Sequence, residues 1–157
     1  MSVEELSELG ITRMEVDEMR GFLSSQRTGV LGLPASDGPY LLPLSYGFDG
    51  ESTLYFTFLL GETSRKEELS DRAGSATFLV YDAQSAFTWE SVVLSGTIEE
   101  VGEEGYDEAA GFLEGAWRPD LLEQAELSRG IAIYRFDVAE WAGLKHTGLP
   151  PGFEPAE

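Results

Sequence analysis

The sequence predicts a mainly β protein, an antiparallel β-barrel with appended helices. Strand-like runs bounded by turn residues outnumber helical patterns along the chain. The length, 157 residues, suits one domain without a linker. We expect residues 1–146 to form this single domain, and residues 147–157, which contain three prolines, to form an extended polar tail.

The first half of the chain begins with a predicted amphipathic helix over residues 15–25, where apolar side chains recur at helical spacing. Two strands follow, Thr28–Leu33 and Tyr40–Phe48, and the Gly- and Pro-containing loop between them indicates a hairpin. A turn at Asp49-Gly50 leads to a third strand, Thr53–Leu60, which is rich in aromatic and β-favouring residues.

The second half alternates strands and helices. A short helix is predicted over Ser64–Arg72, and a strand over Ala76–Tyr81 returns to the sheet. Thr88–Val101 has the alternation of a long strand, and residues 104–117 have the spacing of a second amphipathic helix. Ile131–Val138 is the last clear strand.

The charge of the chain excludes several classes of partner. Ten Lys and Arg residues against 29 Asp and Glu give a formal charge of −19 at pH 7. This charge repels nucleic acids and anionic membrane surfaces, so we expect neither as a partner. Because the acidic residues are spread among normal apolar patterns, they indicate a folded protein adapted to concentrated salt, with an ordinary acidic protein as the alternative.

Other residue types limit metal chemistry and location. The chain has no cysteine and one histidine, His146, so disulfides, thiolate sites and histidine clusters are excluded. A lone histidine close to the tail is expected to be solvated. The acidic N-terminus is unlike a signal peptide, and no run has the length of a membrane span, so the expected location is the cytoplasm.

A cationic pair stands at the start of the helix predicted after the third strand. Ser64 and Glu67 have the spacing of a capping box, which places Arg65 and Lys66 in the first helical turn. Cations are unfavourable at this positive end of the helix dipole unless an anion joins them. Two interpretations stay open: a phosphate-binding turn, or two side chains that pair with carboxylates in solvent.

Three segments in order resemble the FMN-binding split-barrel superfamily typified by pyridoxamine 5'-phosphate oxidase. They are Leu42–Tyr46, then Phe56-Thr57 followed by Ser64-Arg65-Lys66, then Glu90-Ser91-Val92 running to Gly96. The resemblance covers roughly residues 15–101, with a shorter match at Glu140-Trp141. It implies a flavin-binding split barrel that forms a homodimer, with FMN at the interface.

The resemblance also implies roles for individual residues. Arg65 and Lys66 would contact the FMN phosphate ionically, with Ser64 as a hydrogen-bond donor. Trp141 and Lys145 would approach the cofactor from the second subunit. The remaining implied contacts lie along the ring and ribityl chain: Pro43, Leu44, Ser45, Tyr46, Phe56, Thr57 and Ser91.

Read without the resemblance, several of these residues have structural explanations. Pro43 fits an edge strand, while Phe56 and Tyr46 fit an apolar core. Ser91 fits a solvent-facing strand position, and Trp141 fits an anchor that closes the core.

By resemblance, the function is that of an FMN-dependent oxidoreductase acting on an unidentified small molecule, with a deazaflavin as an alternative cofactor. No catalytic acid or base stands out. The Arg, Tyr and His set that would bind a vitamin B6 phosphate is not matched, so that substrate is not expected. The alternatives are a flavin or haem sensing protein, with His146 and Tyr46 as candidate haem ligands, and a cofactor-free interaction module.

The charge predicts a measurable response to salt. Repulsion within a domain of formal charge −19 is relieved when salt shortens the Debye length. The melting temperature should therefore rise between low and molar potassium chloride, measured by differential scanning fluorimetry. A melting temperature that stays flat or falls would contradict salt adaptation.

Overall fold

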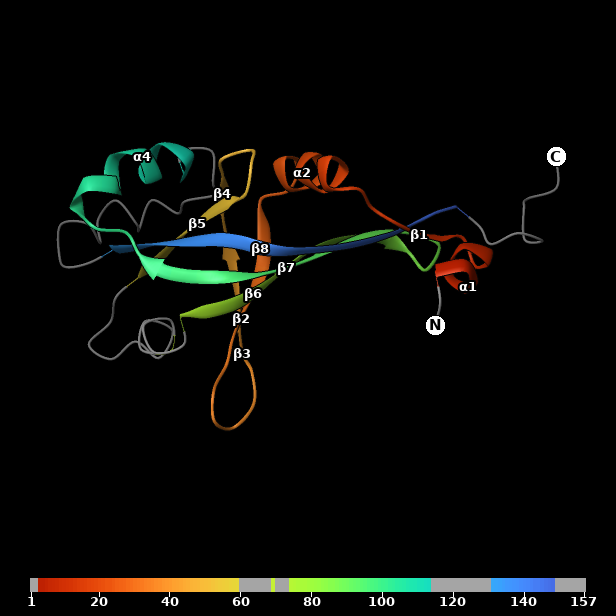
Figure 1. The fold of residues 1–157 in the computed structure, drawn as a ribbon, viewed down its shortest axis with the longest axis horizontal. Helices are drawn as coiled ribbons and strands as arrows, with labels where there is room; N and C mark the ends of the chain where they lie inside the picture. The colour runs from red at the N-terminus through yellow and green to blue at the C-terminus, as the bar shows by residue number, and fades with distance from the viewer. Residues whose placement is uncertain (1–2, 60–68, 70–73, 114–130, 149–157) are drawn as a thin grey trace.

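A computed structural model describes residues 3–59, 69, 74–113 and 131–148 of the chain. It consists of one curled, antiparallel sheet with helices attached, which confirms the split β-barrel expected from the sequence (Figure 1). The strands follow the order β3-β2-β6-β7-β8-β5-β4, and β1 pairs separately with β8. The elements, in chain order, are α1 Val3–Glu8, β1 Ile11–Arg13, α2 Val16–Ser25, β2 Thr28–Leu33, β3 Tyr40–Ser45, β4 Gly47–Phe48, β5 Thr53–Leu59, β6 Ser75–Ser85, β7 Thr88–Glu100, α4 Glu103–Leu113 and β8 Ile131–Thr147.

The centre of the sheet is the pairing of β7 with β8. It runs from Thr88 opposite Thr147 to Glu100 opposite Tyr134, with a bulge between Ser95 and Gly96. Gly96 is required at the bulge, because an added Cβ would overlap the Asp137 carbonyl oxygen. The bulge thus lets two long strands bend without losing their pairing.

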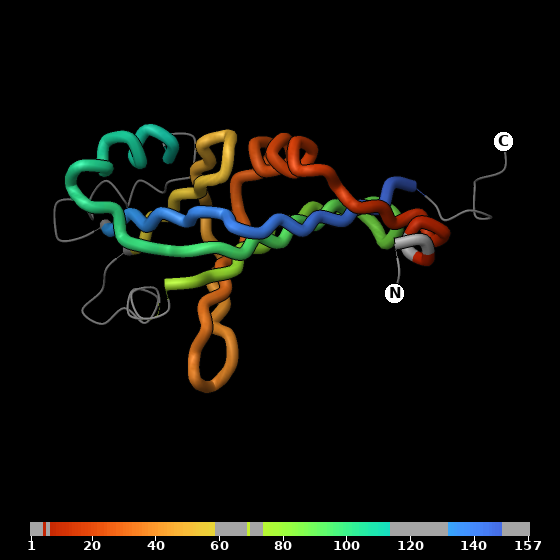
Figure 2. Tube along the Cα trace, viewed as in Figure 1, coloured from red at the N-terminus to blue at the C-terminus, as the bar shows by residue number. Residues whose placement is uncertain are grey.

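The helices and the β2–β3 hairpin lie on opposite sides of this central ribbon. Figure 2 shows α2 and α4 on one side and the hairpin extending away on the other. Helix α2 buries Met19, Phe22 and Leu23 in the main core, and α4 covers a smaller cluster in which Phe112 stacks on Tyr55 at 5.5 Å. None of the helices in the described ranges is long and apolar enough to cross a bilayer.

One face of the sheet packs on the core, and the other face is largely uncovered. Core-facing side chains such as Phe78, Val92 and Leu94 alternate with outward-facing ones along β6 and β7. We call the outward surface of β3, β2, β6, β7 and the adjoining part of β8 the open face. By register it comprises Val30, Gly32, Leu41, Pro43, Thr77, Leu79, Tyr81, Ser91, Val93, Ser95, Glu140, Ala142 and Leu144.

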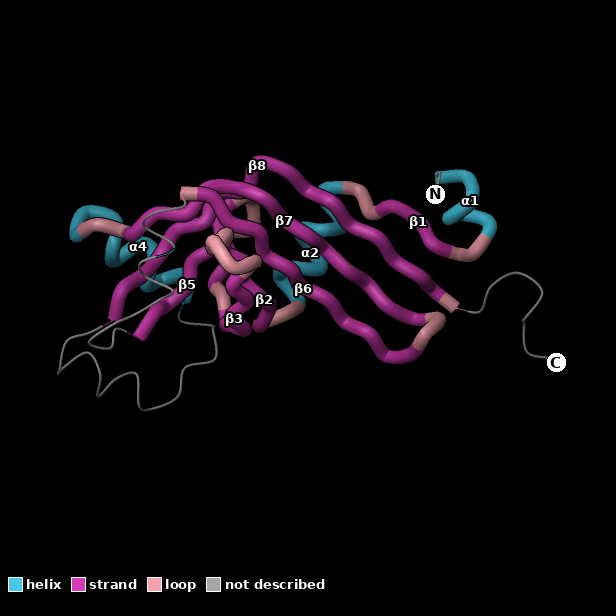
Figure 3. The backbone as a smooth tube through the Cα atoms, turned by 90° about the horizontal axis from the view of Figure 1, so that it is seen from below, coloured by secondary structure: helices cyan, strands magenta, loops and turns pink. Residues whose placement is uncertain are grey.

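The open face carries unusually exposed apolar side chains. Leu41 is 63% exposed, Tyr81 58% and Val93 37%. Figure 3 shows β6, β7 and β8 running together as a ribbon toward β1 and α1, well beyond the β2–β3 hairpin. Glu140 is acidic, and so is Glu99, which continues the same outward side of β7 past the bulge. Surfaces of this kind indicate contact with a ligand or another chain.

Most predicted elements are confirmed, including the helix over residues 15–25 and the first hairpin. The turn at Asp49 is confirmed as well: its Oδ1 accepts from the backbone N–H groups of Glu51, Ser52 and Thr53, and Gly50 has φ +86°. The prediction for the helix Ser64–Arg72 falls almost wholly outside the described residues, as does most of the tail.

Three differences stand out. The last strand does not end at Val138 but continues to Thr147, so the segment Glu140–Lys145 is part of β8. Helix α1 and strand β1 were not predicted, since they are short and polar. The second strand divides at Tyr46 into β3 and β4.

Candidate functional site

Two of the resembling segments meet on one aromatic side chain in the core. The ring centroid of Tyr46 lies 5.4 Å from that of Phe78, edge to face, and the centroid of Phe56 lies 4.8 Å from it. Tyr46 follows β3 and Phe56 lies in β5, two strands that are not neighbours in the sheet. Phe78 in β6 therefore fixes the two segments relative to each other.

Tyr46 has a structural role in this arrangement. Its side chain is 4% exposed, and its hydroxyl donates to the Leu23 carbonyl oxygen at 2.6 Å. Burial raises the pKa of Tyr46 well above its ordinary value of 10.0. The hydroxyl therefore stays protonated, and it is not available as an acid or base.

The strand before Tyr46 offers its backbone. β3 ends the hydrogen-bonded path of the sheet in the described part of the chain, so one of its edges lies outside the ladder. Pro43 is exposed there and Leu44 packs on the core, while Ser45 is half-buried. An edge strand accommodates Pro43, and its free edge can hydrogen-bond a planar ligand laid alongside it.

The proposed phosphate turn cannot be placed. Ser64, Arg65 and Lys66 lie outside the described residues. Thr57 is half-buried near the end of β5, on the same face of its strand as Tyr55, and Leu59 ends that strand. The chain thus leaves β5 at Leu59 and reaches Ser64 five residues later.

The other predicted contacts lie elsewhere on the sheet. Ser91 lies on the open face, paired with Tyr81 on one side and Leu144 on the other. Trp141 and Lys145 point to the opposite face, toward α2. The Arg20 guanidinium lies 5.6 Å from the centroid of Trp141, and Lys145 forms an ion pair with Glu18. Ser91 therefore lies on the opposite side of the sheet from Trp141 and Lys145, and Trp141 packs against the core cluster that contains Tyr46 and Phe56.

His146 is buried, contrary to the sequence-based expectation that it is solvated. It is 5% exposed, with Nδ1 2.7 Å from the Phe87 carbonyl oxygen and Nε2 2.9 Å from the Leu9 carbonyl oxygen. The histidine joins the N-terminal segment to the β6–β7 hairpin. Continuation of β8 past Val138 carries it there, which no sequence pattern indicated.

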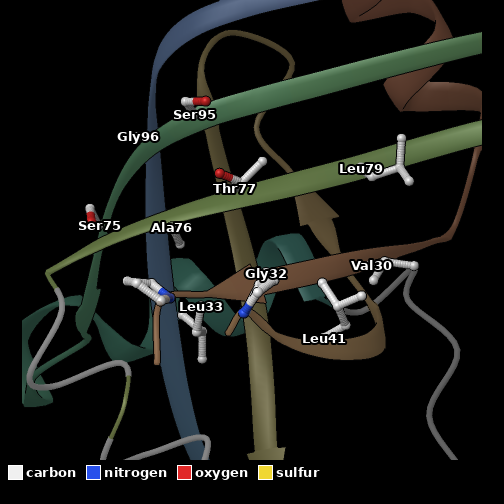
Figure 4. Close-up of a pocket in the computed structure, with 12 residues that line it drawn as sticks. Val30, Gly32, Leu33, Leu41, Ser75, Ala76, Thr77, Leu79, Ser95 and Gly96 are labelled. Atoms are coloured by element: carbon white, nitrogen blue, oxygen red, sulfur yellow. The ribbon is translucent and has the colours of Figure 1, made fainter. Parts of the chain in front are cut away.

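A groove opens beside β3, on the open face. Its volume is about 660 Å³, within the usual range for ligand pockets. Figure 4 shows its two sides, with hydroxyl groups on β6 and β7 across from aliphatic side chains on β2 and β3. The lining residues are Val30, Gly32, Leu33, Pro34, Pro39, Leu41, Ser75, Ala76, Thr77, Leu79, Ser95 and Gly96. Sequence reasoning missed this groove, because its residues come from four strands and share no motif.

The fold and these sites define a split β-barrel protein. Within the described residues, no group of three or more His, Cys, Asp or Glu side chains is placed to hold a metal ion. A family model described as pyridoxamine 5'-phosphate oxidase matches residues 15–145, and the chain belongs to this family. A search of curated proteins gave no match.

Solved structures share the fold at low identity. An FAD-binding protein from Mesorhizobium loti is 19% identical, with TM-score 0.69, over 87% of this chain and 99% of that chain. An FAD-binding protein from Mycobacterium smegmatis is 16% identical, with TM-score 0.66, over 87% and 100%. An FAD- and haem-binding protein from the same organism is 16% identical, with TM-score 0.65, over 94% and 77%.

The buried hydroxyl of Tyr46 leads to a prediction. Tyr46→Phe removes the donor to Leu23, so the free energy of unfolding at pH 7 should fall by about 1 kcal/mol. Because the folded-state pKa is raised, the stability from keeping this phenol protonated is complete below pH 10 and is lost as the pH rises above it. Urea denaturation should therefore show a smaller alkaline loss in Tyr46→Phe than in the wild type.

Tyr81→Phe is the matched control, since Tyr81 is exposed on the same sheet. This change should alter stability by less than about 0.5 kcal/mol. If Tyr46→Phe and Tyr81→Phe change the free energy of unfolding equally, at pH 7 and above pH 10, the structural role given to the Tyr46 hydroxyl is wrong.

Proposed function

We propose that this chain binds FMN and works as a flavin-dependent oxidoreductase on a small molecule. The observation that carries the proposal is the packing of Tyr46 and Phe56 on Phe78, which holds two segments of the family's cofactor pattern together in the core. The family match over residues 15–145 supports the same reading. The names of two structural neighbours, both FAD-binding proteins, support a flavin as the ligand.

The described residues fit a flavin chemically. The free edge of β3 offers backbone donors and acceptors to the polar edge of an isoalloxazine, while the apolar residues around it suit the rings. Arg65 and Lys66 would neutralise the phosphate, with Ser64 donating to it. Bound flavin supplies hydride and electron transfer, and the protein orients it and excludes water. The Tyr46 hydroxyl is protonated and donates to the Leu23 carbonyl oxygen, so it does not accept a proton in the reaction.

A second copy of the chain would complete the site. The resemblance assigns Trp141 and Lys145 to a wall contributed by the other subunit. Both side chains lie on the face of the sheet toward α2, so a second copy that supplies them would present its α2 side to the flavin.

The structure disfavours a haem protein. The two candidate haem ligands, Tyr46 and His146, are buried, and their polar atoms face backbone carbonyl oxygens. A neighbour of this fold is named as FAD- and haem-binding, but neither side chain here is presented to a ligand.

Purification in high salt followed by a visible spectrum tests the main proposal. A flavin spectrum supports it, a deazaflavin spectrum changes the cofactor, and colourless protein that takes up no FMN favours the interaction module.

The phosphate turn gives the first test by mutation. Arg65→Ala/Lys66→Ala should weaken FMN binding by about 3 kcal/mol or more, because charge-assisted hydrogen bonds contribute roughly 1.5–3 kcal/mol each. Lys66→Ala alone should weaken the free energy of FMN binding by about half of this amount. The FMN dissociation constant is measured by fluorescence quenching on titration.

Arg13→Ala is the control, since Arg13 is an exposed cation on β1 and its loss changes the net charge by the same amount as Lys66→Ala. It should leave the FMN dissociation constant within about a factor of two. Unchanged FMN affinity in the double variant would remove Arg65 and Lys66 from the site.

The shared site gives a second test. A purified mixed dimer is prepared with the turn variant Arg65→Ala/Lys66→Ala in one subunit and the wall variant Trp141→Ala/Lys145→Ala in the other. One of its sites has both defects and the other has neither, so it should bind one FMN per dimer, whereas each parent dimer binds poorly. Light scattering checks the oligomeric state.

The control for the wall variant is Glu18→Gln/Arg20→Gln, which removes the contacts of Lys145 and Trp141 with α2 and keeps both side chains. If this control loses FMN as fully as the wall variant does, the loss comes from α2 packing. Monomeric protein with bound FMN would also contradict the shared site.

A further inference from the structure

Among the residues that the structure describes, no ionisable side chain lines the groove beside β3. The described lining residues are aliphatic, proline, glycine, serine or threonine. The rest of the chain is dense in charge, with 39 charged residues in 157. A ligand anion in this groove would have no cation to pair with and would meet the negative field of the whole domain. The groove is therefore suited to uncharged molecules.

The two sides of the groove differ in chemistry. Ser75, Thr77 and Ser95 carry hydroxyl groups on β6 and β7, while Val30 and Leu41 form part of an aliphatic side on β2 and β3 (Figure 4). A ligand that fits both sides has an apolar body and one polar edge. Hydroxyl groups can donate or accept, so they suit carbonyl, nitro or amide groups on that edge.

The floor of the groove bears on the shape of a ligand, and the position of the groove places it beside the strand proposed for the flavin. Gly32 contributes no side chain, and a Cβ there would meet no atom closer than 3.5 Å, so the groove has open space over this position. Leu41 and Val30 lie beside Pro43, since Pro43 pairs with Val30 on the same face. The groove thus adjoins the strand along which the flavin ring is proposed to lie.

We propose that this groove is the substrate side of the flavin site and that it takes small, uncharged, planar molecules with one polar edge. This inference rests on the proposed function, because it places the groove next to a bound flavin. It excludes phosphorylated and carboxylated substrates, including the phosphate esters that the family description implies. Proton donors for such a substrate come from solvent, as the lining offers none that ionises.

The test compares two probes on FMN-loaded protein in molar potassium chloride, where the Debye length of about 3 Å removes long-range repulsion. The probes are 2-methyl-1,4-naphthoquinone and 1,4-naphthoquinone-2-sulfonate, which share a planar ring system and differ in charge. Isothermal titration calorimetry should show binding of the uncharged quinone and at least tenfold weaker binding of the sulfonate. Equal binding of the two probes, or no binding of the quinone, would overturn the proposal.

Two variants locate the binding. Leu41→Asp places a carboxylate in the groove at a side chain that is 63% exposed, so the core is untouched, and quinone affinity should fall at least tenfold. Thr77→Val deletes one hydroxyl with little change in shape and should lower the affinity several-fold. Val16→Asp, at an exposed apolar position on α2, is the control and should leave quinone binding unchanged.

FMN titration and light scattering on the same variants separate the possible failures. If wild-type protein takes up no FMN, the proposed function fails, whatever the quinone does. If FMN binds normally but quinone affinity is equal in Leu41→Asp and Val16→Asp, only the groove assignment fails. If Leu41→Asp instead turns a dimer into monomers, the groove is covered by the second copy, and the proposal is wrong.

Discussion

The pairing of β7 with β8 is the constraint on which the rest of this fold depends. Each of these strands is long enough to serve two regions: one end belongs to the barrel and the other forms the ribbon that reaches β1 and α1. The bulge at Gly96 lies where the pairing of β5 with β8 ends, at Asp137, and lets the sheet curl without breaking the β7–β8 ladder. β6 and β5 then add to opposite edges of this pair, which sets where Phe78 and Phe56 lie.

A second constraint is electrostatic. With a formal charge of −19, almost any surface of the chain repels another copy, and only surfaces poor in carboxylates allow close approach. The groove on the open face is lined by described residues without a carboxylate. Its apolar side chains remain exposed in a single chain, which is costly in solvent and is explained if they are covered in use. The distribution of charge therefore points to the same side of the sheet as the exposed apolar residues do.

Local sequence patterns predicted the fold where one face of an element is buried. Val16–Ser25 has a clear helical stripe, and β7 alternates between core residues such as Leu94 and outward residues such as Val93. The second half of β8 could not be predicted in this way, since both of its faces are partly covered. Trp141 and Gly143 face α2, while His146 faces the N-terminal segment, so apolar and polar residues do not alternate.

The site was predictable only in part, for a related reason. Motif order identified Tyr46 and Phe56, but each of them contacts Phe78, whose position depends on register in β6. The hydrogen bond from Tyr46 to Leu23 joins residues 23 positions apart and has no local signature. The groove gathers residues from four strands, and its chemistry is evident only after those strands are paired. Sequence patterns report contacts within one element, whereas a site made across elements requires the tertiary structure.

The orientation of Trp141 and Lys145 bears on how a shared flavin site can be built. Both side chains are held by α2, through Arg20 and Glu18, while Ser91 lies on the open face. A second copy that presents Trp141 to a flavin therefore also presents α2, so the wall would be a helix and strand together. Such a wall is rigid before the two copies meet, because its aromatic ring is already packed on the core. Preorganisation of this kind lowers the entropy lost when the site is completed.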